Sequence, residues 1–152
     1  MKIKVADIKY ETMTDGVGLR TSIYCQGCNH HCKGCHNPET WDFDGGKEFT
    51  WDTMNEILDS ITANGITRSL AIMGGEPLCE HNAFLTLLVC KTVKEKIPKV
   101  PIYIWSGYTY EHLKHTGDPH VRGVLEIADY LIDGPYVQEL RDVTLPMRGS
   151  SN

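Results

Sequence analysis

The stretch TSIYCQGCNHHCKGC, residues 21–35, joins a β-branched and aromatic run to a loop with four cysteines. The run is typical of a β-strand, so the loop begins where a strand ends. Counted in pairs, the loop is Cys25-x-x-Cys28 and Cys32-x-x-Cys35; counted from the second cysteine, it is Cys28-x-x-x-Cys32-x-x-Cys35. The pairs suit a closed four-ligand metal site, whereas the triplet would leave one iron of an iron–sulfur cluster open.

Beyond this stretch, apolar runs of strand length alternate with segments of helical periodicity. Their order, strand–helix–strand–helix–strand, predicts an α/β fold with a parallel sheet. A closed eight-unit barrel typically takes about 250 residues, and this chain has 152. We therefore expect an open, partial (β/α) barrel built as one domain over residues 1–152. Strands are expected at residues 1–10, 21–25, 69–73, 102–105 and 129–134, and helices at residues 50–61, 83–90, 109–115 and 121–128.

Composition narrows the class of protein. Apolar residues make up 41% and charged residues 23% of the chain, as in ordinary globular proteins. The formal net charge of −5 argues against a nucleic-acid partner. The N-terminus lacks the apolar core of a signal peptide and no run is long enough to span a membrane, so we expect a cytoplasmic protein without a membrane partner. In that reducing compartment, cysteines crowded into one loop favour a metal site over disulfides.

A second motif, GGEP at residues 74–77, directly follows the expected strand at residues 69–73. Two glycines allow the backbone to approach a ligand closely, and Pro77 disfavours helical geometry at Glu76. Loops that follow parallel strands project from one rim of the sheet, so GGEP and the cysteine loop would meet there. Taken alone, the same four residues indicate only a turn.

With its position after a strand, the triplet of Cys28, Cys32 and Cys35 resembles the radical S-adenosylmethionine superfamily. The resemblance implies a 4Fe–4S cluster held by these three thiolates, with S-adenosylmethionine on the open iron. One electron from the reduced cluster then breaks a carbon–sulfur bond, giving methionine and a 5′-deoxyadenosyl radical. GGEP resembles the superfamily motif that meets the methionine end of S-adenosylmethionine, although Glu76 could instead brace the loop. The implied contacts to S-adenosylmethionine come from Gly34, Cys35, His36, Gly74, Gly75 and Glu76.

Further motifs narrow the resemblance to one family. DGVGLR (residues 15–20) resembles the DGPGxR stretch of activases that install glycyl radicals, with Val17 in place of proline. Together with QGCNHHCKGCHNPETW (26–41), WSGY (105–108), DGPYVQELRD (133–142) and MRGSSN (147–152), it resembles the anaerobic ribonucleoside-triphosphate reductase activating proteins. That family implies an oxidoreductase whose partner is the reductase and whose electron donor has a low potential, such as flavodoxin. The glycine loop of the partner would lie near Asp15, Gly16, Gly18 and Arg20.

Several alternatives remain open at this stage. The loop could belong to a non-catalytic module that binds an iron–sulfur cluster or zinc. A structural zinc site could use the four cysteines of the loop or three of them with a neighbouring histidine. A radical enzyme acting on a small molecule would share the same triplet. Cys25 ends an apolar strand, and Cys79 and Cys90 lack metal-type spacing, so we expect these three thiols to be buried fillers. Trp105 and Tyr108 could stack on adenine or belong to the core.

Overall fold

The computed structural model describes residues 3–12 and 18–152, which form a six-stranded mixed sheet with helices. The strand order is β3-β1-β2-β4-β5-β6, and the sheet does not close into a barrel. The α/β class predicted from the sequence is confirmed. The strands are β1 (Lys4–Thr12), β2 (Arg20–Cys25), β3 (Lys47–Glu48), β4 (Ser69–Gly74), β5 (Ile102–Trp105) and β6 (Tyr130–Ile132). The helices are α1 (Trp51–Ile61), α2 (Ala83–Lys96), α3 (Tyr110–Lys114) and α4 (Pro119–Ile127), with short 3-10 turns η1 (Pro38–Thr40), η2 (Ala63–Gly65) and η3 (Gln138–Leu140).

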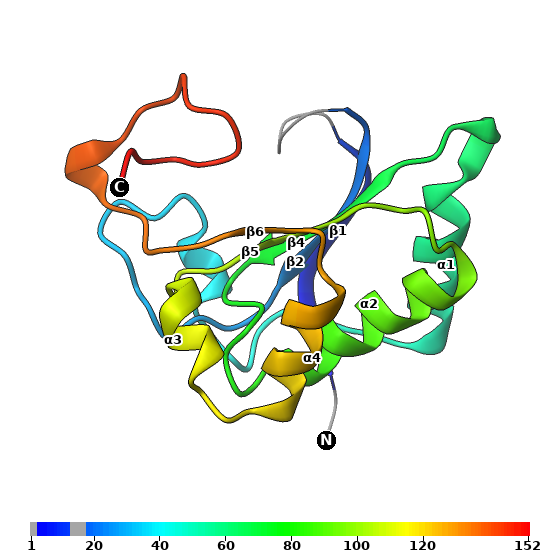
Figure 1. Ribbon diagram of the computed structural model, residues 1–152, viewed down its shortest axis with the longest axis horizontal. Helices are drawn as coiled ribbons and strands as arrows, with labels where there is room; N and C mark the ends of the chain where they lie inside the picture. The colour runs from blue at the N-terminus through cyan, green and yellow to red at the C-terminus, as the bar shows by residue number, and fades with distance from the viewer. Residues whose placement is uncertain (1–2, 13–17) are drawn as a thin grey trace.

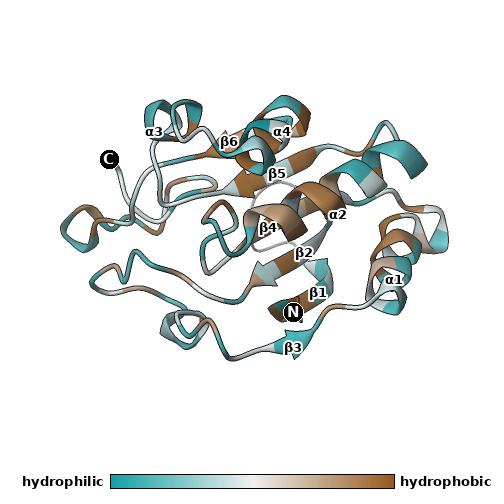
Figure 2. Cartoon of the chain, turned by 90° about the horizontal axis from the view of Figure 1, so that it is seen from below, coloured by the Kyte–Doolittle hydropathy of each residue, from teal (hydrophilic) through white to brown (hydrophobic). Residues whose placement is uncertain are grey.

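Four neighbouring strands, β2, β4, β5 and β6, are parallel, as the sequence predicted. The other two strands make the sheet mixed, because β1 pairs antiparallel with both β2 and β3. Only residues 13–19 separate β1 from β2, and a parallel pair needs a crossover of roughly a dozen residues or more. The two-residue strand β3 is too short for a sequence signal and lies at the hydrophilic edge of the sheet (Figure 2).

The core lies between the sheet and helices α1, α2 and α4, which cover one of its faces (Figure 1). Alternate strand residues such as Ile72 and Ile104 point into it and are almost fully buried. Thr50 caps the N-terminus of helix α1, and its hydroxyl accepts from the backbone N–H of Thr53 at 3.3 Å. Helix α2 ends at Lys96 instead of residue 90, because Val93 continues its buried face. Helical periodicity predicted that Met54, Ile57, Leu58 and Ile61 share the core face of α1. Met54, Ile57 and Ile61 are fully buried, and Leu58 is partly buried against the core.

The opposite face of the sheet carries large aromatic side chains and one buried arginine. The Arg20 guanidinium, from β2, lies 4.0 Å from the ring centroid of Tyr103 and 5.6 Å from that of Trp105, both from β5. Tyr103 stacks in turn on Tyr130 of β6 at 4.5 Å. Among the described residues no helix covers this face; the C-terminal segment lies over one end of it (Figure 1). The structure also holds no helix, within its described part, that is long and apolar enough to cross a membrane.

Candidate functional site

The cysteine loop leaves the sheet at the end of β2 and is closed at its base by a returning segment. The backbone N–H of Gly27 donates to the carbonyl of Thr40 at 2.6 Å, and that of Cys28 donates to the carbonyl of Trp41 at 3.3 Å. The turn η1, with Pro38 at its first position, carries the chain back to this point. The loop is therefore held on both sides before any ligand is considered.

The three cysteines of the triplet line one cavity of about 270 Å³. Two residues between them, His31 and Gly34, have positive φ values of 49° and 76°, which wind the loop tightly. Cys28 is buried, and its burial raises the pKa of the thiol. The backbone N–H of Asn37 donates to the Cys35 sulfur at 3.4 Å. Within the described residues, no three His, Cys, Asp or Glu side chains are grouped so as to hold a single metal ion.

The GGEP loop after β4 is joined to the start of the cysteine loop by backbone hydrogen bonds. Gly75 N–H donates to the Cys25 carbonyl at 2.9 Å, and Glu76 N–H donates to the Gly27 carbonyl at 2.9 Å. A Cβ atom on Gly75 would lie 2.3 Å from the Gly27 carbonyl oxygen. From the sequence we expected the missing Cβ atom of Gly75 to allow a ligand to approach the backbone closely. In the structure the missing Cβ atom allows the backbone of the cysteine loop to approach Gly75.

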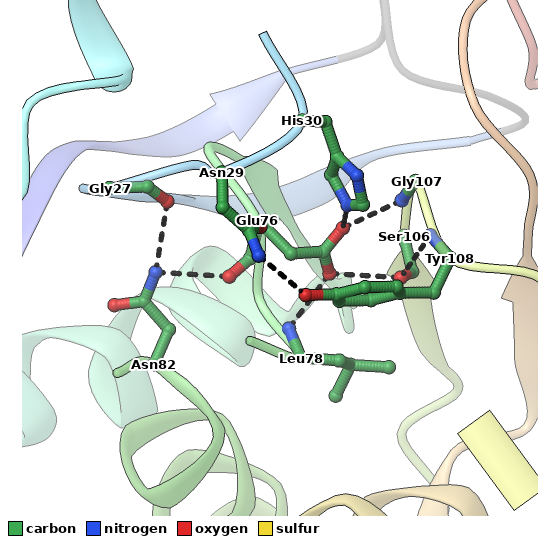
Figure 3. Close-up of polar contacts among 9 residues, drawn as sticks. All are labelled: Gly27, Asn29, His30, Glu76, Leu78, Asn82, Ser106, Gly107 and Tyr108. Atoms are coloured by element: carbon green, nitrogen blue, oxygen red, sulfur yellow. Dashed lines mark hydrogen bonds and ion pairs between the residues drawn. The ribbon is translucent and has the colours of Figure 1, made fainter. Parts of the chain in front are cut away.

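The Glu76 carboxylate is fully buried and links three loops (Figure 3). Its Oε1 accepts from His30 Nε2 and from the backbone N–H of Gly107, both at 2.7 Å. Its Oε2 accepts from the Ser106 hydroxyl and the Leu78 N–H, both at 2.9 Å. A buried carboxylate needs such partners, and four donors satisfy it. The side chain of Glu76 therefore braces the cysteine, GGEP and WSGY loops, the alternative that the sequence left open.

Two further contacts tie the WSGY loop to the cysteine loop. Asn29 Nδ2 donates to the Tyr108 hydroxyl at 2.8 Å, and the Tyr108 ring meets the His30 ring edge-on with centroids 4.5 Å apart. Tyr108 does not line the cavity, whereas Trp105 does. A second cavity-lining tryptophan, Trp41, lies stacked on His31 and was not identified from the sequence.

The C-terminal segment supplies the remaining wall of the cavity, which sequence reasoning also missed. It contributes residues 133–136 and four residues of the RGSSN tail, Arg148, Gly149, Ser150 and Asn152. In the sequence these motifs served only as family markers. No periodic pattern or spacing reveals that a tail this far along the chain returns to a loop near its start.

The structure brings most of the predicted site residues together. Gly34 is an exception, because it does not line the cavity and the Gln138 side chain lies against it. Of the residues expected near a partner loop, Gly18 is exposed and Arg20 is 0% exposed, while Asp15 and Gly16 lie outside the described residues. The predicted residues that line this cavity are Cys28, Cys32, Cys35, His36, Gly74, Gly75 and Glu76.

The other three cysteines are buried free thiols in the interior, as the sequence predicted. Burial raises the pKa of Cys79 to about 11 and that of Cys90 to about 12. It raises the pKa of Cys25 further still. These thiols stay protonated at neutral pH and pack as small apolar groups.

Comparison with known proteins gives the class of this site. Residues 14–152 match the family model described as a 4Fe-4S single cluster domain. The match covers both the cysteine loop and the C-terminal wall of the cavity. The chain therefore belongs to this family of 4Fe–4S single cluster domains.

Individual relatives narrow this class. Proteins of Vibrio cholerae serotype O1 and Pasteurella multocida are 33% and 36% identical over 141 residues, which is 92% of this chain and 88% of each relative. A protein of Enterobacteria phage T4 is 33% identical over 138 residues, 91% of this chain and 83% of the relative. All three are named anaerobic ribonucleoside-triphosphate reductase-activating protein. The chain belongs to this family of activating proteins.

Proposed function

We propose that this chain generates a glycyl radical on anaerobic ribonucleoside-triphosphate reductase, using a 4Fe–4S cluster and S-adenosylmethionine. One observation carries the proposal: Cys28, Cys32 and Cys35 line the same cavity as Gly74, Gly75 and Glu76 of the GGEP loop, which is far away in the sequence. Backbone hydrogen bonds join the GGEP loop to the start of the cysteine loop. The names of the relatives supply the partner.

The residues of the cavity fit such a cluster. Thiolates are the usual ligands of iron–sulfur clusters, and three from one loop would leave one iron for another ligand. We assign Cys28, Cys32 and Cys35 as those ligands. Cys25 is excluded by position, since it is buried at the end of β2 and does not line the cavity. The Asn37 N–H donated to the Cys35 sulfur is a hydrogen bond of the kind that tunes a cluster thiolate.

The same cavity is the proposed site of S-adenosylmethionine. Its wall offers backbone groups of Gly74, Gly75, Cys35 and His36, while the Glu76 side chain is already engaged by four protein donors. We therefore assign backbone groups to the ligand and the Glu76 carboxylate to the brace. When bound, the cluster and S-adenosylmethionine together supply a 5′-deoxyadenosyl radical, with methionine as the other product, for hydrogen abstraction from a glycine of the reductase.

The open face of the sheet is the proposed entrance for the reductase loop. Gly18 lies near the start of β2. The guanidinium of Arg20 is buried against the rings of Tyr103 and Trp105, so Arg20 would affect the reductase loop by positioning these two rings. By family resemblance, Asp15 and Gly16 also belong to this entrance. We further propose that the sheet is a partial barrel of the radical S-adenosylmethionine type and that the chain forms a single domain. It includes a low-potential donor such as flavodoxin and a reducing cytoplasm, where six free thiols persist.

The test is electron paramagnetic resonance on the reconstituted pair. With a reductant, S-adenosylmethionine and the reductase, we expect a carbon-centred radical on the reductase, split by one α-hydrogen. Alanine in place of the reductase's radical glycine should remove the signal. Cleavage of S-adenosylmethionine without any glycyl signal would favour a small-molecule substrate, and a colourless, zinc-loaded protein would favour a structural metal module.

A further inference from the structure

The RGSSN tail is anchored against the rest of the protein on both sides of Arg148. Before it, the Met147 carbonyl accepts from Trp105 Nε1 at 2.6 Å. After it, the Gly149 carbonyl accepts from the Asp142 N–H at 3.0 Å. The backbone at Arg148 is therefore fixed in place although the tail lacks regular secondary structure.

The last residues of the tail are held by their own side chains. Ser150 is only 5% exposed, and its hydroxyl accepts from the Val137 N–H at 3.2 Å and bonds to the Asn152 amide oxygen. Asn152 Nδ2 donates to the Pro135 carbonyl at 2.8 Å. These contacts explain why serine and asparagine occur here, but they leave the arginine without a structural role.

Among the described residues that line the cavity, Arg148 is the one lysine or arginine. Its side chain is exposed and makes no hydrogen bond or ion pair with any described residue. The preceding Met147 has a φ of 63°, a left-handed conformation that is uncommon for a residue with a side chain and often marks a functional site. The structure thus places a cation at the cavity on a constrained backbone.

The acidic groups of the same lining have other partners. Glu76 accepts from four donors, and Asp133 Oδ2 accepts from the Tyr110 N–H at 2.7 Å. His30 is paired with Glu76 at 2.7 Å. A carboxylate that enters the cavity would therefore meet Arg148 as an available positive group.

We infer that Arg148 binds the α-carboxylate of S-adenosylmethionine, an inference that rests on the function proposed above. The guanidinium presents paired donors that match a carboxylate, and such charge-assisted pairs are among the stronger hydrogen bonds. A carboxylate has about four lone-pair sites, so one arginine leaves sites for a further partner. The backbone carbonyls of the cavity wall suit the ammonium group of the same ligand.

The test compares two ligands on cluster-loaded protein by anaerobic equilibrium dialysis, without turnover. The ligands are S-adenosylmethionine and decarboxylated S-adenosylmethionine, which differ only in the carboxylate. For Arg148→Ala we expect S-adenosylmethionine to bind about tenfold more weakly, because a charged hydrogen bond is lost. Binding of the decarboxylated ligand should stay within about twofold of the parent, since it lacks the partner of Arg148. Arg148→Lys, which keeps the charge, should lie between the parent and Arg148→Ala.

The matched control is Arg141→Ala, an exposed arginine of the same segment that does not line the cavity; it should bind both ligands as the parent does. Equal iron content in all variants would show that the cluster site is intact. The inference is overturned if Arg148→Ala weakens both ligands equally, or weakens neither while reducing binding to the reductase. Failure of the parent itself to bind S-adenosylmethionine would instead overturn the proposed function.

Discussion

The four cysteines of the loop differ most in where their sulfur atoms lie. Cys28, Cys32 and Cys35 line the cavity, whereas Cys25, at the start of the loop, is buried in the core on the other side of the backbone. Sequence spacing alone allowed both a four-ligand and a three-ligand site. The proposed three-ligand site rests on the position of Cys25, which is the last residue of β2 and packs in the core.

Single alanine substitutions test this assignment. We expect Cys28→Ala, Cys32→Ala and Cys35→Ala each to lose most of the iron after anaerobic reconstitution, since each removes a thiolate ligand. Cys25→Ala should keep the iron content of the parent and lose about 1 kcal/mol of stability, because it removes one small buried group. Iron analysis and the visible absorption of the cluster measure both effects. If Cys25→Ala loses iron as fully as Cys28→Ala, the three-ligand assignment is wrong.

Glu76 is the second residue whose role depends on the folded structure. Glu76→Gln replaces one acceptor oxygen with an NH₂ group, which would face two donors of the present network. We expect the free energy of unfolding to fall by about 2–4 kcal/mol, the range for unsatisfied buried donors and broken buried networks. Iron content should fall with it, because His30 anchors the cysteine loop to Glu76.

Denaturant unfolding under anaerobic conditions measures this change. Glu80→Gln is the matched control, because it makes the same chemical change at an exposed position four residues further along. Parent-like stability of Glu76→Gln would contradict the brace. The sequence identified Glu76 as a site residue but could not choose between brace and ligand, since its partners at residues 30 and 106–107 come from other loops.

At the scale of elements, local patterns predicted the strands and helices well. Alternation identified β1, and helical periodicity identified the core face of α1. The patterns predicted the parallel strands but not the pairing at the other edge of the sheet, where β1 is antiparallel to β2 and β3 is too short to be recognised. Pairing depends on connection length and on contacts distant in sequence, which a window along the chain does not contain.

The join between β4 and the cysteine loop gives a prediction at this scale. Gly75→Val places side-chain atoms against the Gly27 carbonyl, which a Cβ atom would approach to 2.3 Å. We expect the two loops to separate, with a loss of about 1–3 kcal/mol in stability and a reduced iron content. Gly123→Ala, in helix α4, is the control, because its Cβ atom would meet only the flexible side chain of Leu87. A Gly75→Val protein with full iron content but poor S-adenosylmethionine binding would contradict this prediction. It would indicate that residue 75 is a glycine because the ligand approaches its backbone closely, as the sequence analysis expected.

At the scale of the whole molecule, the site is assembled from segments that span most of the chain. The wall formed by the cysteine triplet and GGEP was predictable, because each follows one of two neighbouring parallel strands, β2 and β4. The C-terminal wall was not, because its position depends on isolated contacts such as that between Trp105 and Met147 and the bridge from Arg141 to Ser150. Irregular segments carry no periodic signal, so only the folded chain reveals that the tail closes the cavity.

The parallel pairing of β2 with β4 also constrains the order of events during maturation. The cysteine loop, β3 and α1 all lie in the connection between these two strands, and the backbone hydrogen bonds between the loop and GGEP form next to the end of this pairing. Parallel pairing of strands far apart in the sequence forms late in folding, because the chain that connects them must first lose conformational entropy. Iron and sulfide supplied to the refolded chain should therefore fill the site as completely as the same reagents present throughout refolding. Markedly greater filling in the second case would mean that the metal centre itself guides the two strands together.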